Sequence, residues 1–385
     1  MSTACVDVII PVYNGEKTIE SAVASIQAQT VRGIRIIIVN DGSTDATKLI
    51  VEGLAAADKR VVLLDTANGG IVDALNTGLA ACRADIIARH DADDLAHPGR
   101  FEKQLAYLHE HSDCAAVSGA FCQIDEAGRP LGPIQHLSSP DLANLDWYPQ
   151  REPYLLHPFL MMRRAAVEAI GGYRHVFHAE DTDLFWRLQE KGQLANMPDL
   201  LGDYRIHAQS VTSVSVVNGR ISALNSQLAG LSAMRRRTGR PDIAFQKSAL
   251  REYQEARTLE GIVSLGSRGL DAAEVQRLAA TVSAKLLESA GYRPYELEIE
   301  DCAFIRKALS DAMPHMEAAN RRSCSQMLSG TAARLAYGGK VSAALQLAPP
   351  ALYLVAAARL ALRAVLPPNL RRSVRKAAGR DAFVK

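Results

Sequence analysis

Short apolar runs alternate with longer amphipathic segments through the first part of the chain. The run Val6–Val12 is rich in β-branched residues, which is typical of a strand buried on both faces of a parallel sheet. Residues 19–26 then carry apolar side chains at helical spacing. Further apolar runs at 34–39, 61–64 and 86–88 continue this alternation. Strands and helices that alternate at this interval predict right-handed βαβ units, and hence a parallel sheet covered by helices.

The pattern weakens in the middle of the chain and becomes helical towards its end. We expect a helix after Pro98 and short strands at 115–118, 160–164 and 200–207. Residues 121–158 contain six prolines and few periodic runs, so we expect loops there. Loops of this kind often carry binding residues, so this region is a candidate for contact with an acceptor substrate. The pattern predicts an α/β fold in three parts: a sheet domain at 1–213, a helical region at 214–340 and a basic amphipathic tail at 341–385.

Carboxylates follow two of the predicted strands. Asp41 ends the second strand, and the stretch DIIARHDADD, which ends at Asp94, places three acids within four positions. Because a doubly wound sheet collects the carboxyl ends of its strands on one edge, we expect Asp41 and Asp91 to line one cleft. Crowded carboxylates are costly to ionise, and Mg²⁺ or Mn²⁺ binds such oxygens together with substrate phosphates. The alternative is a solvated acidic turn that caps the helix near Pro98.

Composition and missing motifs exclude several classes of protein. The 385 residues are 48% hydrophobic and 22% charged, which excludes disordered and collagen-like chains. The sequence has no GxGxxG after the first strand, no P-loop motif and no HExxH, so dinucleotide, P-loop and zinc-peptidase enzymes are disfavoured. Six scattered cysteines without a CxxC pair favour reduced thiols over a zinc site or a disulfide framework. The N-terminus runs directly into a strand, so we expect no signal peptide.

A second acidic cluster, HAEDTD at 178–183, lies at a predicted helix start. Capping is one interpretation, because acids in a first helical turn are stabilised by up to about 1 kcal/mol. The other interpretation is a general base that removes a proton from an attacking hydroxyl, which typically contributes ~10² to 10⁴-fold in rate. We expect Asp181 in this role, with Glu180 as the second choice.

Taken together, the motifs resemble those of the family 2 glycosyltransferases, which have the GT-A fold. The resemblance extends from about residue 6 to residue 213, and the order of the motifs makes it specific. The motifs are PVYNGE at 11–16, VNDGSTDAT at 39–47, NGG at 68–70, ALNTG at 74–78, RHDADD at 89–94, HPFLMMRR at 157–164, GGYR at 171–174, AED at 179–181, LFWRL at 184–188 and YRIH at 204–207.

The resemblance implies a Rossmann-like nucleotide-sugar-binding domain with a mostly parallel central sheet, followed by an α-helical C-terminal region. It also implies that Asp91 and Asp93 form the DXD motif, which holds Mn²⁺ or Mg²⁺ on the diphosphate of the donor. In the family's pattern Asp41 contacts the nucleotide base and Asp181 is the catalytic base. His207 resembles a family position near the diphosphate or the metal, with a buried strand-end histidine as the alternative.

The predicted donor site collects residues from several strand ends. From residue type alone, Asp41 suits hydrogen bonds to a base or ribose and Tyr13 suits packing on a ring, with helix capping and core-edge packing as alternatives. His90 departs from the family's usual hydrophobic residue before the DXD acids, which leaves the metal preference open. The predicted nucleotide-sugar residues are Pro11, Tyr13, Glu16, Asp41, Asn68, Asp91, Ala92 and Asp93, and the predicted metal ligands are Asp93, Asp91 and His207.

The predicted function is metal-dependent, inverting sugar transfer of the hexosyltransferase type. The donor is a nucleotide sugar, with a UDP-sugar favoured, and the acceptor is a saccharide or lipid-linked saccharide in cell-envelope or exopolysaccharide synthesis. A sugar nucleotidyltransferase is an alternative, but it would carry a glycine-rich basic loop where this chain has Tyr13–Glu16. A non-catalytic binding protein of the same fold is another, against which the presence of Asp91, Asp93 and Asp181 argues.

The C-terminal tail predicts a second kind of partner. From Arg321 to Lys385 the chain has twelve basic residues and one acid, against a formal net charge of +2 for the whole chain. An apolar segment at 350–366 followed by basic residues can lie on an anionic membrane surface; a helix docked on the catalytic domain is the alternative. We expect a cytoplasmic protein, with peripheral attachment to the inner face of the cytoplasmic membrane as the hypothesis for this tail. Aromatic residues are scarce in the basic run, so we expect no nucleic-acid partner.

Overall fold

The computed structural model describes residues 5–206, 215–293 and 295–365, with side chains as far as residue 361. Its contacts divide the chain into two compact units. The sheet unit comprises Met1–Ala143, Glu152–Val176 and Glu180–Ala208, and the helical unit comprises Asn144–Arg151, Phe177–Ala179 and Gln209–Lys385. Two short segments that were expected in the sheet domain therefore group with the helices.

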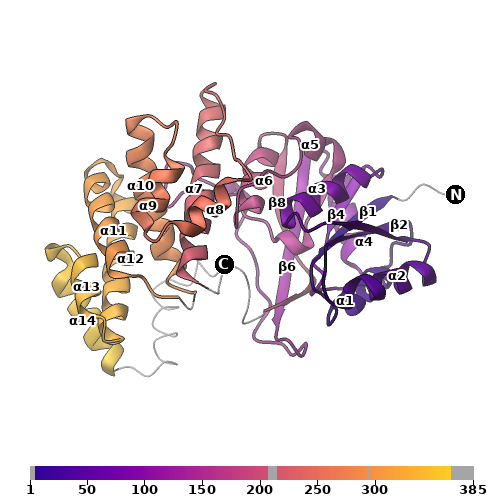
Figure 1. The fold of residues 1–385 in the computed structure, drawn as a ribbon, viewed down its shortest axis with the longest axis horizontal. Helices are drawn as coiled ribbons and strands as arrows, with labels where there is room; N and C mark the ends of the chain where they lie inside the picture. The colour runs from indigo at the N-terminus through magenta and orange to yellow at the C-terminus, as the bar shows by residue number, and fades with distance from the viewer. Residues whose placement is uncertain (1–4, 207–214, 294, 366–385) are drawn as a thin grey trace. The chain divides into compact units, whose positions relative to one another are not determined.

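The sheet unit is built on an eight-stranded sheet with the strand order β3-β2-β1-β4-β7-β6-β8-β5. Pairing is parallel between β1 and β2, β1 and β4, β2 and β3, and β6 and β8, and antiparallel in the other three pairs. The predicted α/β fold with a mostly parallel sheet is therefore confirmed (Figure 1). The strands are β1 (Val6–Val12), β2 (Ile34–Asp41), β3 (Val61–Thr66), β4 (Ile86–Arg89), β5 (Leu95–Ala96), β6 (Cys114–Ile124), β7 (Met161–Arg163) and β8 (Gln193–Arg205).

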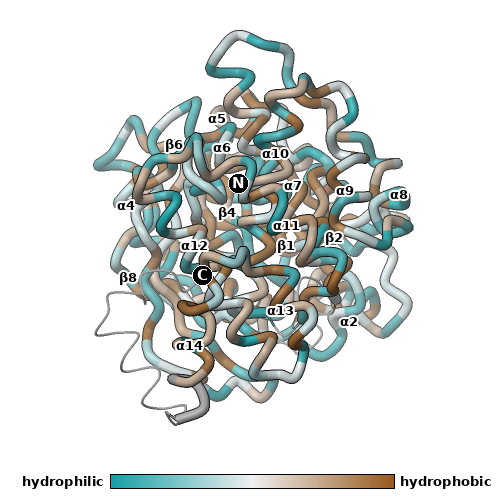
Figure 2. The backbone as a smooth tube through the Cα atoms, turned by 90° about the vertical axis from the view of Figure 1, so that its left-hand side faces the viewer, coloured by the Kyte–Doolittle hydropathy of each residue, from teal (hydrophilic) through white to brown (hydrophobic). Residues whose placement is uncertain are grey.

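β1 is buried on both sides because helices cover both faces of the sheet. Val8 and Ile10 pack in one core cluster with Phe101, whereas Ile9 packs in another with Leu75. The Val and Ile residues of β1 and β2 give these strands much of their brown colour in Figure 2. The helices of the sheet unit are α1 (Ile19–Gln27), α2 (Thr47–Ala57), α3 (Ile71–Ala81), α4 (Arg100–Glu110), α5 (Arg164–Ala169) and α6 (Glu180–Gln189), with the short 3₁₀ turns η1 (Pro140–Leu142) and η2 (His157–Phe159).

Two strands are much longer than the sequence pattern predicts. The strand expected at 115–118 is β6, and the strand expected at 200–207 is β8, which starts already at Gln193. β6 contains Ala, Ser and Gly residues of low strand propensity, and its ladder with β8 shifts register near Gly119. Pairing with a partner strand, which local propensity does not report, therefore sets the length of both strands.

The helical unit has its own apolar core, built mainly from α7, α10, α11 and α12. Among the described residues no single helix has the length and apolar composition of a membrane span, and only the bent pair Val341–Leu347 and Pro350–Ala361 meets both criteria when taken together. The elements are α7 (Val216–Arg237), α8 (Ala249–Glu255), α9 (Leu259–Gly266), α10 (Ala272–Ser289), α11 (Ile299–Ala312), η3 (Met313–His315), α12 (Ala318–Tyr337), α13 (Val341–Leu347), η4 (Pro350–Leu352) and α14 (Tyr353–Val365).

Candidate active site

The carboxyl ends of three parallel neighbours, β2, β1 and β4, meet at one edge of the sheet. Val12 at the end of β1 is in register with Asn40, one residue before the end of β2. The residues at and after these ends, Asp41, Tyr13 and Asp91, therefore emerge side by side. The structure thus places Asp41, Tyr13 and Asp91 at this edge.

Asp41 is almost buried and holds the neighbouring loop in place. Its Oδ1 accepts a hydrogen bond from the backbone N–H of Gly69 (2.7 Å), and its Oδ2 accepts one from Gly70 (2.9 Å). Asn68 Nδ2 donates to the backbone oxygen of Asp41 (3.0 Å), and a Cβ on Gly42 (φ +69°) would lie only 2.6 Å from the backbone nitrogen of Asn68. The carboxylate is therefore rigidly oriented, and each oxygen keeps acceptor capacity for a ligand.

The loop after β1 contributes one exposed ring and several hydrogen bonds to the segment after β2. Tyr13 is 53% exposed, so its ring is available to pack on a planar ligand. The Glu16 Oε2 atom accepts a hydrogen bond from the backbone N–H of Ala46 (3.0 Å), which ties this loop to the start of α2. Pro11 is buried within β1.

Three carboxylates, Asp91, Asp93 and Asp94, offer oxygen atoms that all lie within 4.8 Å of one another. Half-buried Ala92 separates the first two. Burial raises the pKa of Asp91 to about 6; its ion pair with Arg89 opposes this rise, and the charge of Asp93 adds to it. Carboxylate oxygens at this spacing are the donor set that Mg²⁺ and Mn²⁺ prefer, and a bound cation would relieve their repulsion. The residues present therefore fit a divalent metal.

Asp94 differs from the other two acids of the cluster. It is fully buried, its Oδ1 accepts the backbone N–H of Arg205 (2.7 Å), and its Oδ2 has no hydrogen-bond partner among the described residues. Burial, helped by Asp91, raises the pKa of Asp94 well above its ordinary value, which favours the protonated form.

The unusual His90 is a buried hydrogen-bonding residue. Its Nε2 lies 3.2 Å from the backbone oxygen of Asp94, and its Nδ1 lies 3.3 Å from Nη1 of Arg100. Burial, with the charge of Arg100, holds the pKa of His90 well below its ordinary value, so the ring is neutral. A neutral imidazole inside a hydrogen-bond network explains how histidine fits a position where an apolar residue was expected.

The second acidic cluster opens α6. The backbone N–H of Thr182 donates to Asp181 Oδ1 (2.7 Å), which orients this carboxylate. Burial raises the pKa of Glu180 to about 7, with the charge of Asp181 as the next cause, and burial also raises the pKa of Asp181. A carboxylate with a raised pKa is a stronger proton acceptor near neutral pH.

Arg89 links the two acidic clusters, and the sequence analysis assigned it no role. Its charge lowers the pKa of both Glu180 and Asp181, while the charge of Asp91 raises that of Glu180, so the clusters lie within electrostatic reach. The Nε and Nη1 atoms of Arg89 are buried without a hydrogen-bond partner among the described residues. In the sequence, the one feature that could have indicated this role is the position of Arg89 at the end of an otherwise apolar strand.

A histidine–tyrosine pair was also missed, although both residues belong to quoted motifs. His157 Nε2 and the hydroxyl of Tyr173 are 2.7 Å apart and buried. Burial, with the charge of Arg89, holds the pKa of His157 well below its ordinary value. His207, the third predicted metal ligand, lies outside the described residues.

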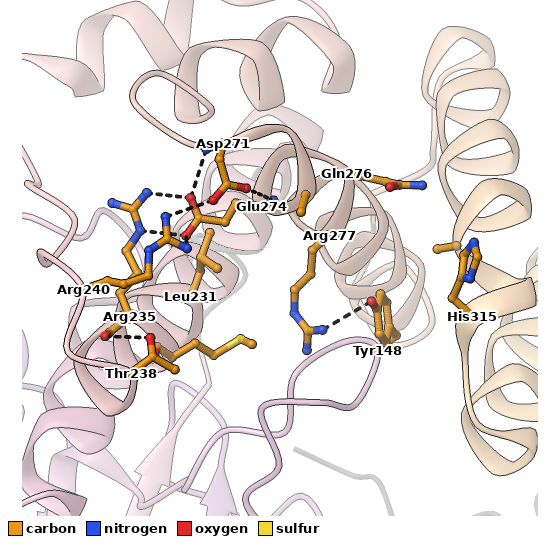
Figure 3. A pocket seen from close by; sticks show the side chains of 13 residues that line it. Tyr148, Leu231, Arg235, Thr238, Arg240, Asp271, Glu274, Gln276, Arg277 and His315 are labelled. Carbon is orange, nitrogen blue, oxygen red and sulfur yellow. Dashed lines mark hydrogen bonds and ion pairs between the residues drawn. The ribbon is translucent and has the colours of Figure 1, made fainter.

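The helical unit contains a cavity of about 410 Å³ lined by two arginine–carboxylate pairs and a third arginine (Figure 3). Arg235 pairs with Glu274 (2.6 Å), and Arg240 pairs with Asp271 (3.0 Å). Arg277 lies 3.5 Å from the hydroxyl of Tyr148. None of the predicted site residues that the structure describes lines this cavity. The acids of the two clusters that suit the predicted chemistry all lie in the sheet unit.

Comparison with known proteins agrees with the sequence motifs. Residues 7–171 match the family model described as glycosyl transferase family 2. The amylovoran biosynthesis glycosyltransferase AmsE of Erwinia amylovora is 31% identical over 211 residues, which are 53% of this chain and 77% of that protein. The O-antigen biosynthesis glycosyltransferase WbnJ of Escherichia coli is 29% identical over 209 residues, which are 53% of this chain and 81% of that protein.

A solved structure shares the fold. S. aureus TarS 1-349 in complex with UDP-GlcNAc aligns with a TM-score of 0.51 at 17% sequence identity, covering 89% of each chain. This likeness confirms the predicted GT-A fold with a helical C-terminal region.

Proposed function

This chain belongs to glycosyltransferase family 2, and on that premise we propose that it transfers a sugar from a nucleotide-sugar donor to a saccharide acceptor, with inversion at the anomeric carbon. The observation that carries the proposal is the convergence of two acidic clusters in the sheet unit. Asp91 and Asp93 suit a metal-bound diphosphate, and Asp181 suits a base that acts on an acceptor hydroxyl.

We assign the metal to Asp91 and Asp93. Mn²⁺ or Mg²⁺ bound there would neutralise the charge that develops on the departing diphosphate. Asp94 has one oxygen engaged by a backbone N–H and favours the protonated form, so we assign it the support of the loop and not ligation. Arg89 keeps Asp91 in place through their ion pair.

We assign the base to Asp181. Its oxygen is oriented by the backbone N–H of Thr182, and its raised pKa suits a group that accepts a proton from a sugar hydroxyl. Attack on the face opposite the leaving diphosphate gives a single displacement with inversion. Holding the hydroxyl and the anomeric carbon together supplies much of the remaining rate acceleration. Glu180 is the second choice, since burial raises its pKa to about 7.

We assign nucleoside recognition to the edge formed by β1 and β2. Asp41, oriented by the loop at 68–70, would accept hydrogen bonds from the base, and the exposed ring of Tyr13 would pack on it. Uracil is favoured, since TarS with the same fold was solved with UDP-GlcNAc. Pro11, Glu16, Asn68 and Ala92 would complete this site, and His207 would approach the diphosphate.

We propose a growing cell-surface polysaccharide, carried on a lipid, as the acceptor. The relatives AmsE and WbnJ are named for amylovoran and O-antigen biosynthesis. The C-terminal end of the chain suits such a substrate, because Leu354 is 86% exposed and Val355 is 43% exposed on α14 while the chain beyond is basic. An apolar helix beside basic residues favours the inner face of an anionic membrane. Within the helical unit, Arg359 Nη1 donates to the backbone oxygen of Gln326 and so holds α14 on α12.

The donor is tested by release of nucleoside diphosphate from a panel of UDP-, GDP- and dTDP-sugars, with Mn²⁺, Mg²⁺ or chelator. We expect slow, metal-dependent hydrolysis of a UDP-sugar by the native chain and its loss in Asp93→Asn. Turnover of another nucleotide sugar would correct the donor. Metal-dependent binding of a nucleotide sugar with no turnover, even when saccharide acceptors are supplied, would support a binding protein instead.

A further inference from the structure

A buried carboxylate in the first part of α6 bridges two arginines. Asp183 is fully buried; Arg174 Nε donates to its Oδ2 (3.0 Å), and Arg174 Nη2 also pairs with its Oδ1. Arg187, one turn later on α6, donates from Nε to Asp183 Oδ2 (2.8 Å). Both oxygens of Asp183 are therefore committed to charged donors, and the two arginines more than compensate its negative charge.

Arg187 also holds the loop that precedes α6. Arg187 Nη1 donates to the backbone oxygens of Ile170 (2.8 Å) and Gly172 (2.7 Å). On the other side of this loop, Asn76 Nδ2 donates to the backbone oxygen of Tyr173 (2.9 Å), and its Oδ1 accepts the backbone N–H of Tyr173 (2.9 Å). The loop at 170–174 is thus fixed both to α6 and to α3.

Close packing and an unusual backbone conformation restrict this loop at Gly172. Gly172 has φ +71°, and a Cβ there would lie 2.7 Å from Asn76 Oδ1. A glycine is therefore required both by conformation and by the approach of Asn76. The anchored loop presents Arg174 to Asp183, two residues after Asp181.

Asp183 and Asp181 lie in the first turn of the same helix, α6. Contacts that hold Asp183 therefore also fix the rotation of α6 about its axis and its position along that axis, and so the position of Asp181. Neutralisation by two arginines also means that Asp183 adds no net repulsion to Glu180 and Asp181. We propose that Arg174, Asp183 and Arg187 form a clamp that positions the catalytic base, and that the three are positioning residues which do not touch the substrate. This inference rests on the proposed role of Asp181.

The structure offers a matched control for Arg174 elsewhere in the sheet unit. Arg35 pairs with Asp7 through two hydrogen bonds of 2.8 Å, and the side chains are 22% and 1% exposed, against 23% and 0% for Arg174 and Asp183. Asp7 lies near the start of β1, at the end of the strand away from the proposed site. Loss of either arginine leaves a buried carboxylate short of a partner, so both losses destabilise the unit.

The test compares Arg174→Gln with Arg35→Gln in the full chain. We expect similar losses of thermal stability in the two variants but a kcat lower by about 10- to 100-fold only in Arg174→Gln, because a misplaced base costs rate. The KM for the donor and the metal-dependent binding of UDP should stay within threefold of the native values. Arg174→Lys should have a higher kcat than Arg174→Gln, because lysine restores the positive charge but cannot contact both oxygens of Asp183 as the guanidinium does.

Amide hydrogen exchange supplies a readout that does not depend on activity. Backbone amides at 181–184 should exchange faster in Arg174→Gln than in the native chain, and at the native rate in Arg35→Gln. Equal kcat in the two variants, or unchanged exchange at 181–184, would overturn the clamp. A native chain without any transferase activity would instead overturn the proposed function, and the exchange comparison would still decide whether the clamp exists.

Discussion

Glu180 and Asp181, at the start of α6, are both candidates for the catalytic base, and their environments differ. Asp181 has an oxygen fixed by the Thr182 N–H, whereas Glu180 has a pKa raised to about 7 by burial and by the charge of Asp181. Orientation favours Asp181, and proton affinity alone favours Glu180. Substitution and pH dependence can therefore tell the two apart.

We predict that Asp181→Asn lowers kcat by at least about 10²-fold, and that Glu180→Gln lowers it by less than about tenfold. The base must be ionised, so activity should rise with pH through the pKa of the base. Because burial raises the pKa of Asp181, the acidic limb should lie above the ordinary range of an aspartate. A limb at about 7 that disappears together with activity in Glu180→Gln would assign the role to Glu180.

The acidic cluster after β4 allows a second prediction at the residue scale. Since burial favours protonated Asp94, Asp94→Asn is nearly isosteric and isoelectronic with the native state, and we expect kcat and the thermal midpoint to change little. Asp93→Asn removes a proposed ligand and should abolish metal-dependent UDP binding. Calorimetric titration of UDP with and without Mn²⁺ distinguishes the two. Equal loss of binding in both variants would make Asp94 a ligand.

Residues at strand ends were predictable because their role follows from position along the chain. Asp41 and Asp91 each follow an apolar run, and parallel strands collect such residues at one edge. Arg89, His157 and the Asp183 clamp were not predictable, because their meaning depends on partners distant in sequence that only packing supplies.

At the scale of elements, the turn after β2 sets the geometry of the donor site. Gly42 has φ +69° and lies against the backbone of Asn68, whereas Gly128 has φ +80° with nothing within 4 Å of its missing Cβ. Any other residue at either position adopts an unfavourable conformation, but only at position 42 must the loop at 68–70 move.

We therefore predict that Gly42→Ala raises the KM for the donor about tenfold or more with a smaller change in kcat, because the loop held by Asp41 shifts. Gly128→Ala is the matched control and should leave both parameters within twofold. Steady-state kinetics of the two variants is the measurement. An unchanged KM in Gly42→Ala would remove this turn from donor binding.

The elements themselves were predictable in proportion to their local signals. The runs of Val and Ile in β1 and β2 identify buried strands, while β6 and β8 gain length from each other and β5 is only two residues long. Pairing between distant strands outweighs local propensity in this half of the sheet.

At the scale of the whole molecule, an exposed apolar residue of α14 lies beside the basic C-terminal end of the chain. Leu354 on α14 is 86% exposed, and Leu49 on α2 is 72% exposed, so the two leucines form a matched pair of surface sites. Only the first lies next to the basic end of the chain, where each basic group near an anionic surface is worth about 1 kcal/mol.

We predict that the native chain co-floats with vesicles of phosphatidylglycerol and phosphatidylcholine but not with phosphatidylcholine alone. Leu354→Asp, and separately removal of residues 366–385, should weaken this binding several-fold, whereas Leu49→Asp should not. Flotation that is equal in all four proteins would mean that the tail does not bind membrane, and that α14 serves only to pack on α12.

The central claim is that one carboxylate of the sheet unit activates an acceptor while a metal-bound nucleotide sugar departs. It is tested most directly by measuring nucleoside diphosphate release from the preferred donor, with metal, by the native chain and by Asp181→Asn, alongside donor binding. The account predicts donor binding by both proteins and turnover only by the native chain. Equal turnover by Asp181→Asn would contradict it.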